Sequence, residues 1–409
     1  MSRIFNTFSN YLQMKKKLVL AYSGGLDTSY CVKYFTDEEN LEVHTILVNT
    51  GGFSAEQLKA VEEKAYKLGA TTHKTADVTH EYYQKCIKYL VFGNILKNNT
   101  YPLSVSSERT FQAIEIANYT KELNADFVAH GSTGAGNDQV RFDLIFNLLI
   151  PNVQIITPVR DKTLSRQSEI DYLQMKGFEA DWTKSTYSIN QGLWGTSIGG
   201  KETLTSSKTL PEYAYLNQVS QKEPQKLEIE FKNGEIESIN GENYSDKIKA
   251  IQKLNEIGSK YALGRGMHVG DTILGSKGRV GFEAPAAMLT IEAHRTLEKY
   301  VLTKWQMHWK EQLANWYGML LHEAQYLDPV MQNIEKFLED TQKTVSGKVF
   351  ITLYPYHFVV EGIESKYDML SSKFGTYGEE NTLWSGDDVK GFTKILSNQI
   401  KLFNAVTKE

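Results

Sequence analysis

The sequence has little cysteine and no long hydrophobic run. Its 409 residues include only two cysteines, Cys31 and Cys86, too few for a disulfide framework or for a zinc site with four thiolate ligands. A chain without disulfides is typical of a reducing cytoplasm, which is the compartment we expect. The longest apolar stretch, residues 144–159, is broken by Asn147 and Pro151 and falls short of the ~20 apolar residues that span a bilayer. The first 13 residues carry one basic residue and no apolar core, so we expect neither a secretory signal nor a membrane segment.

Positive charge is not in excess either. Lys and Arg number 45 against 49 Asp and Glu, which gives a net charge of −4. Binding to nucleic acid regardless of sequence needs a basic footprint, so we expect no nucleic-acid partner. The 41% of hydrophobic and 23% of charged residues are ordinary for a folded protein and exclude a mainly disordered chain. At roughly 100–200 residues per domain, the length predicts two or three domains.

Residues 17–182 alternate short apolar runs with stretches of helix length. One of these helices is marked by Ser54 as its N-cap and Gly69 as its stop. Strands that are apolar almost throughout and are separated by helices predict an α/β domain with a doubly wound parallel sheet. Ligands of such sheets bind at the carboxyl ends of the strands. The five predicted strands are Leu18–Tyr22, Glu42–Thr50, Thr72–Val78, Asp126–Gly131 and Val153–Val159.

The pattern changes after Trp182 and predicts a second domain of α+β type over residues 183–380. Its features are a Ser/Thr/Gly-rich stretch, a hairpin that turns at Asn233-Gly234, a helix capped by Ser245, a Gly-rich segment, long amphipathic helices over about 286–344, and two further strands. Residues 1–16 form a separate extension, and residues 381–409 hold a helix. The apolar stripe of that helix favours contact with another subunit.

The strongest chemical signal is SGGLDTS, residues 23–29, between a predicted strand and a predicted helix. Gly24 and Gly25 let an anion approach backbone N–H groups, and the helix N-terminus favours negative charge. Asp27 would repel phosphate unless it holds a cation such as Mg²⁺ or caps the helix. The loop is neither a Walker A loop nor a dinucleotide turn. An ordinary glycine turn is the simpler alternative, but the whole string in this context favours a loop that cradles pyrophosphate.

A second motif, HGSTGAGNDQVRF, follows the strand predicted at 126–131. Asn137, Asp138 and Arg141 present an amide, an acid and a guanidinium within about one helical turn. This set suits a zwitterionic amino acid, with Arg for its carboxylate and Asp for its ammonium. A capped helix start with a solvated Asp/Arg pair is the alternative. His130 is better explained as a structural histidine that donates to the loop backbone than as a general base.

SGGLDTS resembles the pyrophosphate loop of the N-type ATP pyrophosphatases, which cleave ATP between the α and β phosphates and adenylate an oxygen of the substrate. The second motif resembles HGATGKGNDQVRFE of the argininosuccinate synthase family. YSINQGLWGTSIGG, residues 187–200, resembles that family's YSIDENLWGRSIEGG, and LNEIGSKYALGR and FEAPAAMLTIEAHRTLE also follow its pattern. The resemblance covers nearly the whole chain after Met14, and by it the chain is identified as a member of this family.

The resemblance implies a cytoplasmic homotetrameric ligase. It would join citrulline and aspartate through citrullyl-AMP, with ATP and Mg²⁺, and give argininosuccinate, AMP and pyrophosphate. The implied ATP contacts are Ala21, Tyr22, Ser23, Gly24, Gly25, Leu26, Asp27, Thr28, Ser29, Val48 and Gly131, with Asp27 also the candidate metal ligand. The implied aspartate contacts are Thr133, Asn137 and Asp138, and the implied citrulline contacts are Tyr101, Ser106, Asn137, Arg141, Ser188 and Ser197. Asp27, Asp138 and Arg141 are the catalytic candidates.

Some positions depart from the family pattern at the citrulline end. The family's citrulline-binding Glu falls on Gly270, and its citrulline-binding Tyr falls on Phe282. Asp271 is one residue from the missing carboxylate, and we favour a local shift that brings it into the vacated place. The alternative is the same chemistry on an N-acylated citrulline, whose α-amine is uncharged. Gly270, Asp271 and Phe282 therefore stay among the citrulline-site candidates.

Three other kinds of protein remain as alternatives. Another N-type ATP pyrophosphatase ligase is the first, although a tRNA sulfurtransferase would want reactive cysteines and a basic surface. A glutamine-hydrolysing synthetase would want a nucleophilic cysteine near the N-terminus. The second is a non-catalytic ATP-binding module, which would not need the intact aspartate motif. The third is an interaction protein built on the C-terminal helices.

Overall fold

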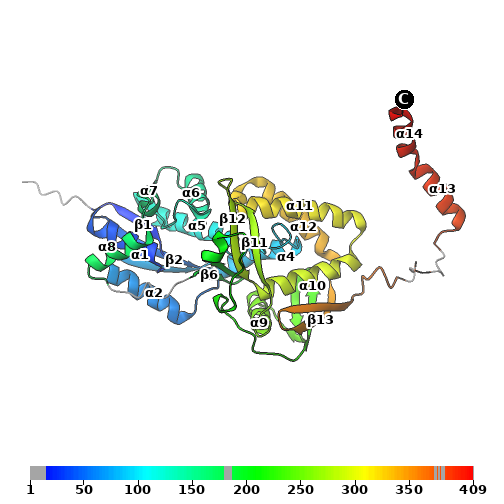
Figure 1. Ribbon diagram of the computed structural model, residues 1–409, viewed down its shortest axis with the longest axis horizontal. Coiled ribbons are helices and arrows are strands. Elements are labelled where there is room, and N and C mark those ends of the chain that lie inside the picture. Colours follow the sequence, from blue (N-terminus) through cyan, green and yellow to red (C-terminus); the bar gives the residue numbers. More distant parts are fainter. Residues whose placement is uncertain (1–14, 179–186, 373–374, 376–377, 379–382, 409) are drawn as a thin grey trace, which may run out of the picture.

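The computed structural model describes residues 15–178, 187–372, 375, 378 and 383–408. Figure 1 shows two lobes side by side and a C-terminal pair of helices that reaches away from them. The first lobe is built around a parallel sheet and the second around two antiparallel sheets. No helix among the described residues is both long and apolar enough to cross a bilayer.

The first sheet has the strand order β3-β2-β1-β4-β5, and every pair in it is parallel. Each strand overlaps one of the five predicted runs, so the predicted α/β class is confirmed. The order reverses between β1 and β4, and an open α/β sheet offers a ligand site beyond the carboxyl ends of its strands at such a point. The strands are β1 (Lys17–Ala21), β2 (Glu42–Asn49), β3 (Thr72–Asp77), β4 (Phe127–Ala129) and β5 (Gln154–Ile156).

Alternate residues of β1 face two separate cores. Leu18 and Leu20 pack in one core with helices α1, α2 and α8, and Val19 and Ala21 pack in the other with α5 and α6. Helices therefore cover both faces, as a doubly wound sheet requires. The helices of this lobe are α1 (Leu26–Asp37), α2 (Ala55–Leu68), α5 (Ser104–Glu122), α6 (Asp138–Leu149), α7 (Pro158–Asp161) and α8 (Arg166–Met175).

A short helical segment between β3 and α5 belongs to the second lobe by its packing. It consists of α3 (Thr79–Tyr82), the π-helical turn η1 (Tyr83–Ile87) and α4 (Lys88–Phe92). Its side chains, such as Tyr82 and Leu90, are buried in the same core as the helices and strands after residue 190. The sequence boundary at residue 182 assigns this segment to the first domain, although it packs into the core of the second lobe.

The second lobe contains a four-stranded sheet of order β11-β12-β7-β6 and a five-stranded sheet of order β10-β9-β8-β13-β14. The first consists of β6 (Ser188–Gly192), β7 (Gly195–Gly199), β11 (Arg265–Asp271) and β12 (Lys277–Glu283). The second consists of β8 (Gln225–Lys232), β9 (Glu235–Ile239), β10 (Glu242–Asn243), β13 (Gly347–Tyr354) and β14 (His357–Glu364). The predicted hairpin at Asn233-Gly234 is confirmed as the β8–β9 turn. Neither strand pair of the four-stranded sheet was predicted, since their segments are rich in glycine.

The long helices of this lobe lie where the sequence predicted them, with one change of cap. Asp246, not Ser245, is the N-cap of α9, because its carboxylate accepts a hydrogen bond from the Ile248 N–H at 3.0 Å. The helices are α9 (Lys247–Ser259), α10 (Pro285–Val301), α11 (Lys304–His322) and α12 (Pro329–Thr341), with the 3₁₀ turns η2 (Lys201–Leu204), η3 (Glu212–Ala214), η4 (Gln325–Leu327) and η5 (Gln342–Thr344).

The C-terminal tail forms two helices rather than the single predicted one. They are α13 (Gly386–Leu396) and α14 (Asn398–Thr407), and they meet at Ser397. Neither helix has a buried residue, and in Figure 1 both lie apart from the two lobes.

Candidate active site

The SGGLDTS loop joins β1 to α1 at the point where the strand order reverses. Gly24 has a φ of 74°, a left-handed conformation that favours glycine. Gly25 is the N-cap of α1 and provides no side-chain cap, so the first N–H groups of this helix remain available to an anion. Within the loop, Ser23 Oγ accepts from the Gly25 N–H at 3.3 Å, and Thr28 Oγ1 donates to the Gly25 carbonyl at 3.3 Å. Ala21 and Tyr22 precede the loop and are buried.

A lysine that the sequence analysis missed supports this loop. Lys64 on α2 donates from Nζ to the Gly24 carbonyl at 2.6 Å, and burial lowers the pKa of its ammonium to about 8. The side chain of Val61, one turn earlier, lies 3.0 Å from the Cβ that a side chain at Gly24 would have. No local pattern marks Lys64, because its approach to the loop depends on how α2 packs against β1.

Asp27, in the first turn of α1, faces a second carboxyl group that the sequence did not reveal. Glu169 on α8 is 1% exposed, and its Oε2 has no hydrogen-bond partner among the described residues. Burial, together with the nearby Asp27 carboxylate, raises the pKa of Glu169 to about 8. A carboxyl pair of this kind either shares a proton or accepts a cation between its members.

This pair gives a pH-dependent contribution to stability. The pKa of Glu169 is raised in the folded protein, so the folded state binds more protons than the unfolded state between about pH 4.3 and pH 8. The free energy of unfolding should therefore fall as pH rises through this window. We expect Glu169→Gln to remove most of this fall in the free energy of unfolding. At about 1.4 kcal/mol per pH unit, the fall amounts to a few kcal/mol across the window. Urea unfolding at pH 5.5 and 8.5 measures the effect, with Asp171→Asn, an exposed position on the same helix, as the control. Equal slopes for the native protein and Glu169→Gln would contradict the shift.

The second motif meets the first directly. Gly131 follows β4, and a Cβ at this position would lie 3.2 Å from the backbone carbon of Asp27 and 3.0 Å from Cγ2 of Thr28. His130 accepts from the Ser132 N–H at 3.2 Å through Nδ1, so its Nε2 carries the proton and donates to Asp143 at 2.9 Å. This histidine has the expected structural role in the loop, but it accepts from the backbone rather than donating to it. Thr133 lies exposed in the same loop.

Asp138 is the centre of an ion-pair network at the start of α6. Its carboxylate accepts from Arg109 Nε at 2.8 Å and from a terminal nitrogen of Arg141 at 2.7 Å. Burial opposes ionisation of Asp138, but the two guanidinium groups outweigh it and lower its pKa to about 2. Arg109, which the sequence analysis missed, also donates to the Asn190 side chain at 2.8 Å and so connects this network to β6. Asp138 remains 35% exposed, which leaves its carboxylate accessible to a further donor.

Asn137 and Arg141 are tied to the second lobe. The side-chain oxygen of Asn137 accepts from the Ile273 N–H at 2.9 Å, at the tip of the β11–β12 hairpin. Arg141 is buried, and its guanidinium donates to the His322 carbonyl at 3.0 Å and contacts the His322 ring at 3.2 Å. The amide nitrogen of Asn137 and the remaining N–H groups of Arg141 are the donors left for a substrate carboxylate.

Four of the predicted citrulline residues, Ser188, Ser197, Gly270 and Phe282, share one face of the four-stranded sheet. Ser188 opposes Gly199, Asn190 opposes Ser197, and Ser197 opposes Phe282, and residues directly opposite one another lie on the same face. Gly270 lies on this face too, because Phe282 opposes Gly266 and side chains alternate along β11. Arg109 of α5 donates a hydrogen bond to Asn190, so this face of the sheet is directed toward α5.

Tyr101 and Ser106 border this face from the N-terminal side of α5. The Tyr101 ring stacks on His268 at 5.3 Å between centroids and contacts Phe282 at 5.5 Å. Its hydroxyl accepts from Ser104 Oγ and from the Val105 N–H, both at 3.3 Å. Ser106 is buried and donates to the Leu103 carbonyl at 3.3 Å. Val48 lies apart from this group, buried near the carboxyl end of β2.

Asp271 lies on the opposite face of β11. It is 67% exposed and forms an ion pair with Lys277, its partner across the hairpin. Bringing Asp271 to the inner face would require a one-residue slip against β12, which would reverse the face of every side chain in the strand. Seven residue pairs hold the present register, from Arg265 with Glu283 to Asp271 with Lys277. The local shift that we favoured from the sequence therefore has a high structural cost.

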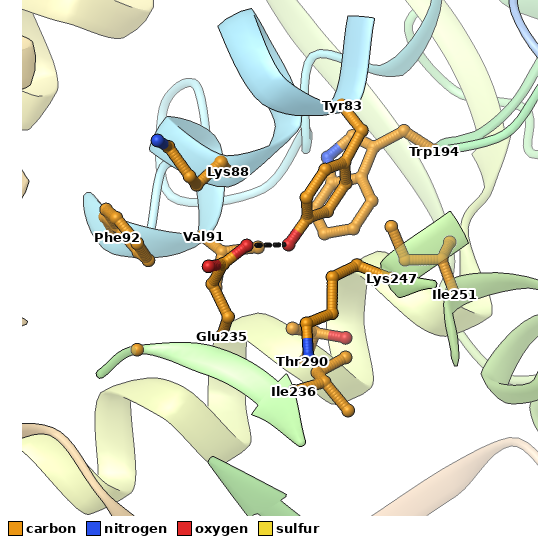
Figure 2. A pocket seen from close by; sticks show the side chains of 11 residues that line it. Tyr83, Lys88, Val91, Phe92, Trp194, Glu235, Ile236, Lys247, Ile251 and Thr290 are labelled. Carbon is orange, nitrogen blue, oxygen red and sulfur yellow. Dashed lines mark hydrogen bonds between the residues drawn. The ribbon is translucent and has the colours of Figure 1, made fainter. Parts of the chain in front are cut away.

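Two hollows of the second lobe lie away from these residues. Figure 2 shows a small pocket across which the Tyr83 hydroxyl donates to Glu235 at 2.7 Å. Its volume of about 10 Å³ suits one water molecule. A wider hollow of about 590 Å³ is lined by Thr196 and Glu283, on the face of the four-stranded sheet opposite to Phe282. Neither hollow is lined by a predicted site residue.

Comparison with known proteins covers both lobes. Residues 17–179 match the family model described as the arginosuccinate synthase N-terminal HUP domain, and residues 187–403 match the arginosuccinate synthase C-terminal domain. The chain is 37% identical to the argininosuccinate synthase of Methanocaldococcus jannaschii over 370 residues, 90% of this chain and 93% of that protein. It is 36% identical to that of Dictyoglomus thermophilum over 392 residues, 95% of this chain and 98% of that protein. The enzyme of Pyrococcus furiosus is 35% identical over 94% of this chain and 93% of its own length.

Proposed function

Because this chain belongs to the argininosuccinate synthase family, a family of ATP-dependent ligases, we propose that it joins citrulline to aspartate at the expense of ATP and forms argininosuccinate. The observation that carries the proposal is the contact between the two motif loops. Gly131 lies against the Asp27–Thr28 backbone, and the loop that contains it leads directly into α6, which begins at Asp138 with its two arginines. The loop proposed to bind phosphate and the network proposed to bind an amino acid are thus adjacent, as a reaction between ATP and an amino acid requires.

The proposed reaction has two steps. The ureido oxygen of citrulline attacks the α-phosphorus of ATP, the bond from that phosphorus to the bridging oxygen breaks, and citrullyl-AMP and pyrophosphate form. The α-amine of aspartate then attacks the ureido carbon. AMP leaves with the former ureido oxygen, and loss of a proton from the attacking nitrogen gives argininosuccinate. The ureido oxygen is a weak nucleophile, so alignment of the bound reactants supplies much of the rate.

The first loop is proposed to bind ATP and to stabilise departing pyrophosphate. The uncapped N-terminus of α1 offers backbone N–H groups to the phosphates, and Lys64 adds positive charge beside Gly24. The donor set also fits Mg²⁺, since the carboxyl groups of Asp27 and Glu169 lie within hydrogen-bonding reach of each other, and Mg²⁺ usually takes one or two carboxylates together with substrate phosphates. When bound there, Mg²⁺ would neutralise charge on the phosphates.

The second motif is proposed to bind the two amino acids. The Asp138 carboxylate would accept a hydrogen bond from the ammonium of the substrate aspartate. Arg109 and Arg141 hold the Asp138 carboxylate in position. One acid between two arginines leaves a net positive site, which suits the carboxylates of both amino acids. Thr133 and Asn137 would complete the aspartate site. The inner-face serines Ser188 and Ser197, with Tyr101 and Ser106, would line the citrulline site.

Pyrophosphate release tests the whole proposal. We expect release only when ATP, aspartate and a ureido amino acid are all present, and mass spectrometry should find a product that contains both amino acids. A non-catalytic ATP-binding module would bind ATP and release no pyrophosphate under the same conditions, and this result would overturn the proposal.

Asp138→Ala should impair the second step more than the first. The variant loses the acceptor for the aspartate ammonium, whereas the ATP loop is untouched. We expect net synthesis to fall by about 10²-fold, as for loss of a charged positioning group. Positional exchange of labelled oxygen in ATP should persist with the ureido substrate alone. Glu122→Gln, an exposed position on α5, is the control. If exchange disappears as completely as net synthesis, Asp138 does not act on aspartate.

A homotetramer in the cytoplasm completes the proposal. The tail helices support an oligomer, because their apolar side chains are exposed in the single chain.

A further inference from the structure

An imidazole and an amide border the space directly above Gly270, on the inner face of the four-stranded sheet. A Cβ at Gly270 would lie 2.7 Å from Nε2 of His268 and 3.3 Å from Nδ2 of Asn98. Two nitrogen atoms therefore meet at the place that a side chain at position 270 would fill. This place belongs to the predicted citrulline face, because the His268 ring stacks on Tyr101 and the Tyr101 ring contacts Phe282.

Both nitrogen atoms are hydrogen-bond donors that a ligand can use. The Asn98 amide gives one hydrogen to the Val269 carbonyl at 3.2 Å, which leaves its second hydrogen for a ligand. His268 is 6% exposed, and its Nδ1 is enclosed without a partner among the described residues, whereas its Nε2 is not enclosed. Buried N–H groups without an acceptor are rare, so the proton of the neutral ring is assigned to Nε2.

The electrostatic surroundings of these two donors favour a negative ligand. Burial, followed by the charge of Lys97, lowers the pKa of His268, so the ring is a neutral donor at pH 7. Burial, followed by the Arg141 guanidinium, lowers the pKa of the neighbouring His322 ring to about 2. Asp271, the acid nearest in sequence, lies on the outer face of the sheet. A ligand that enters between these groups is therefore favoured when it is an anion.

We propose that His268 and Asn98 bind the α-carboxylate of citrulline, with the Nε2–H of the ring and the second N–H of the amide as donors. The inference rests on the proposed function and assigns two further residues to its citrulline site. The carboxylate would enter the space above Gly270, which is open because this residue has no side chain. An acidic side chain at position 270 would bind the α-ammonium instead, so the two donors set the direction in which the amino-acid end of citrulline lies.

Replacing His268 with phenylalanine tests the role of the ring nitrogen. This variant keeps a ring on Tyr101 and removes the donor. We expect KM for citrulline to rise roughly 10–100-fold, as for one lost hydrogen bond to a charged group, while kcat stays within about threefold. His268→Gln, whose amide N–H can replace Nε2–H, should recover most of the loss. The matched control is His357→Phe, an exposed histidine that stacks on Tyr354 at 5.0 Å, and it should leave KM unchanged. A native KM in His268→Phe would overturn the proposal, because the ring would then only pack.

Two analogues of citrulline identify the group that His268 contacts. 5-Ureidopentanoate lacks the α-amine, and citrullinamide lacks the charged carboxylate. Both are measured as competitors of citrulline, so neither has to react. In His268→Phe the inhibition constant should rise at least tenfold for 5-ureidopentanoate and less than threefold for citrullinamide. The opposite pattern would assign Nε2 to the α-ammonium, and equal changes would indicate a general disturbance of the site; either result overturns the proposal. If the native protein releases no pyrophosphate with citrulline, aspartate and ATP, the proposed function itself fails.

A second variant lies on the surface, where it does not endanger the fold. Asn98 is exposed and has a φ of 50°, a conformation that aspartate also tolerates. Asn98→Asp places a negative acceptor where the substrate carboxylate needs a donor, so KM for citrulline should rise at least tenfold at nearly constant kcat. Asn99→Asp is the matched control, because Asn99 is exposed, has a φ of 57° and gains the same charge one residue away. Equal rises in KM for the two variants would overturn the contact with Asn98.

Discussion

Replacing Asp27 with alanine should lower pyrophosphate release by roughly 10²–10³-fold, the range seen when a single group that stabilises developing charge is removed. Asp27 lies in the first turn of α1, beside the backbone of Gly131 and the carboxyl group of Glu169. Without it, Mg²⁺ would keep one protein carboxylate instead of two, and the charge on departing pyrophosphate would be less well neutralised. The rate is measured with saturating ATP, Mg²⁺, aspartate and the best ureido substrate.

Asp37→Ala is the matched control for this experiment. Asp37 ends the same helix and pairs with Lys33 and Lys176 at the surface, far from the loop along α1. We expect the rate of the Asp37→Ala variant to stay within twofold of the native rate, because Asp37 lies far from the loop. Its loss should also leave the protein folded, since exposed ion pairs contribute little to stability. The Asp27 variant should keep its thermal midpoint, since it also removes the charge that faces buried Glu169. Near-native turnover in Asp27→Ala would show that the loop works without this carboxylate.

The nucleotide half of the fold was predictable because its signals are local. Each strand of the parallel sheet is an apolar run, and α2 is marked at both ends by Ser54 and Gly69. The two motif loops follow β1 and β4, and the parallel sheet alone brings those strand ends together. The contact between Gly131 and the Asp27–Thr28 backbone is the consequence.

The four-stranded sheet was not predictable from its own segments. β11 and β12 contain Gly266, Gly270, Gly278 and Gly281, so neither strand has the alternation of apolar and polar residues that indicates a strand. On the inner face glycine leaves room for aromatic rings, such as Phe282 over Gly266. The contribution of α3, η1 and α4 to the second core was equally hidden, since only tertiary packing decides it.

The face on which each candidate side chain lies also required the structure. Asp271 is one residue from Gly270 in the sequence, and this closeness suggested that it could replace a missing acid. In a strand, adjacent residues point to opposite faces, so closeness in sequence separates them in space. The partners that matter at the site come from distant segments: Arg109 for Asp138, Glu169 for Asp27, and His268 for Tyr101. No motif links the members of these pairs.

The exposed apolar side chains of the tail helices are the basis of a second prediction, which concerns the oligomeric state. α13 and α14 expose side chains that a solvated helix would not carry, among them Phe392 (64% exposed), Ile395 (72%) and Phe403 (65%). The helices lie apart from both lobes of their own chain (Figure 1). On α11, Trp305, Trp309 and Trp316 are each more than half exposed. A chain with two such apolar surfaces that do not meet is expected to bury them against other copies of itself.

Deletion of residues 386–409 should therefore convert the assembly to smaller species. We expect light scattering to give about four times the chain mass of 46.5 kDa for the intact protein and a single chain mass after deletion. The double variant Phe392→Glu, Phe403→Glu should do the same while it keeps the chain length, since each buried Phe contributes about 1.5–3 kcal/mol. Lys390→Gln, an exposed polar position on α13, should leave the mass unchanged. A mass near 46.5 kDa for the intact protein would rule out the tetramer, and the tail would then have no partner copy to cover it.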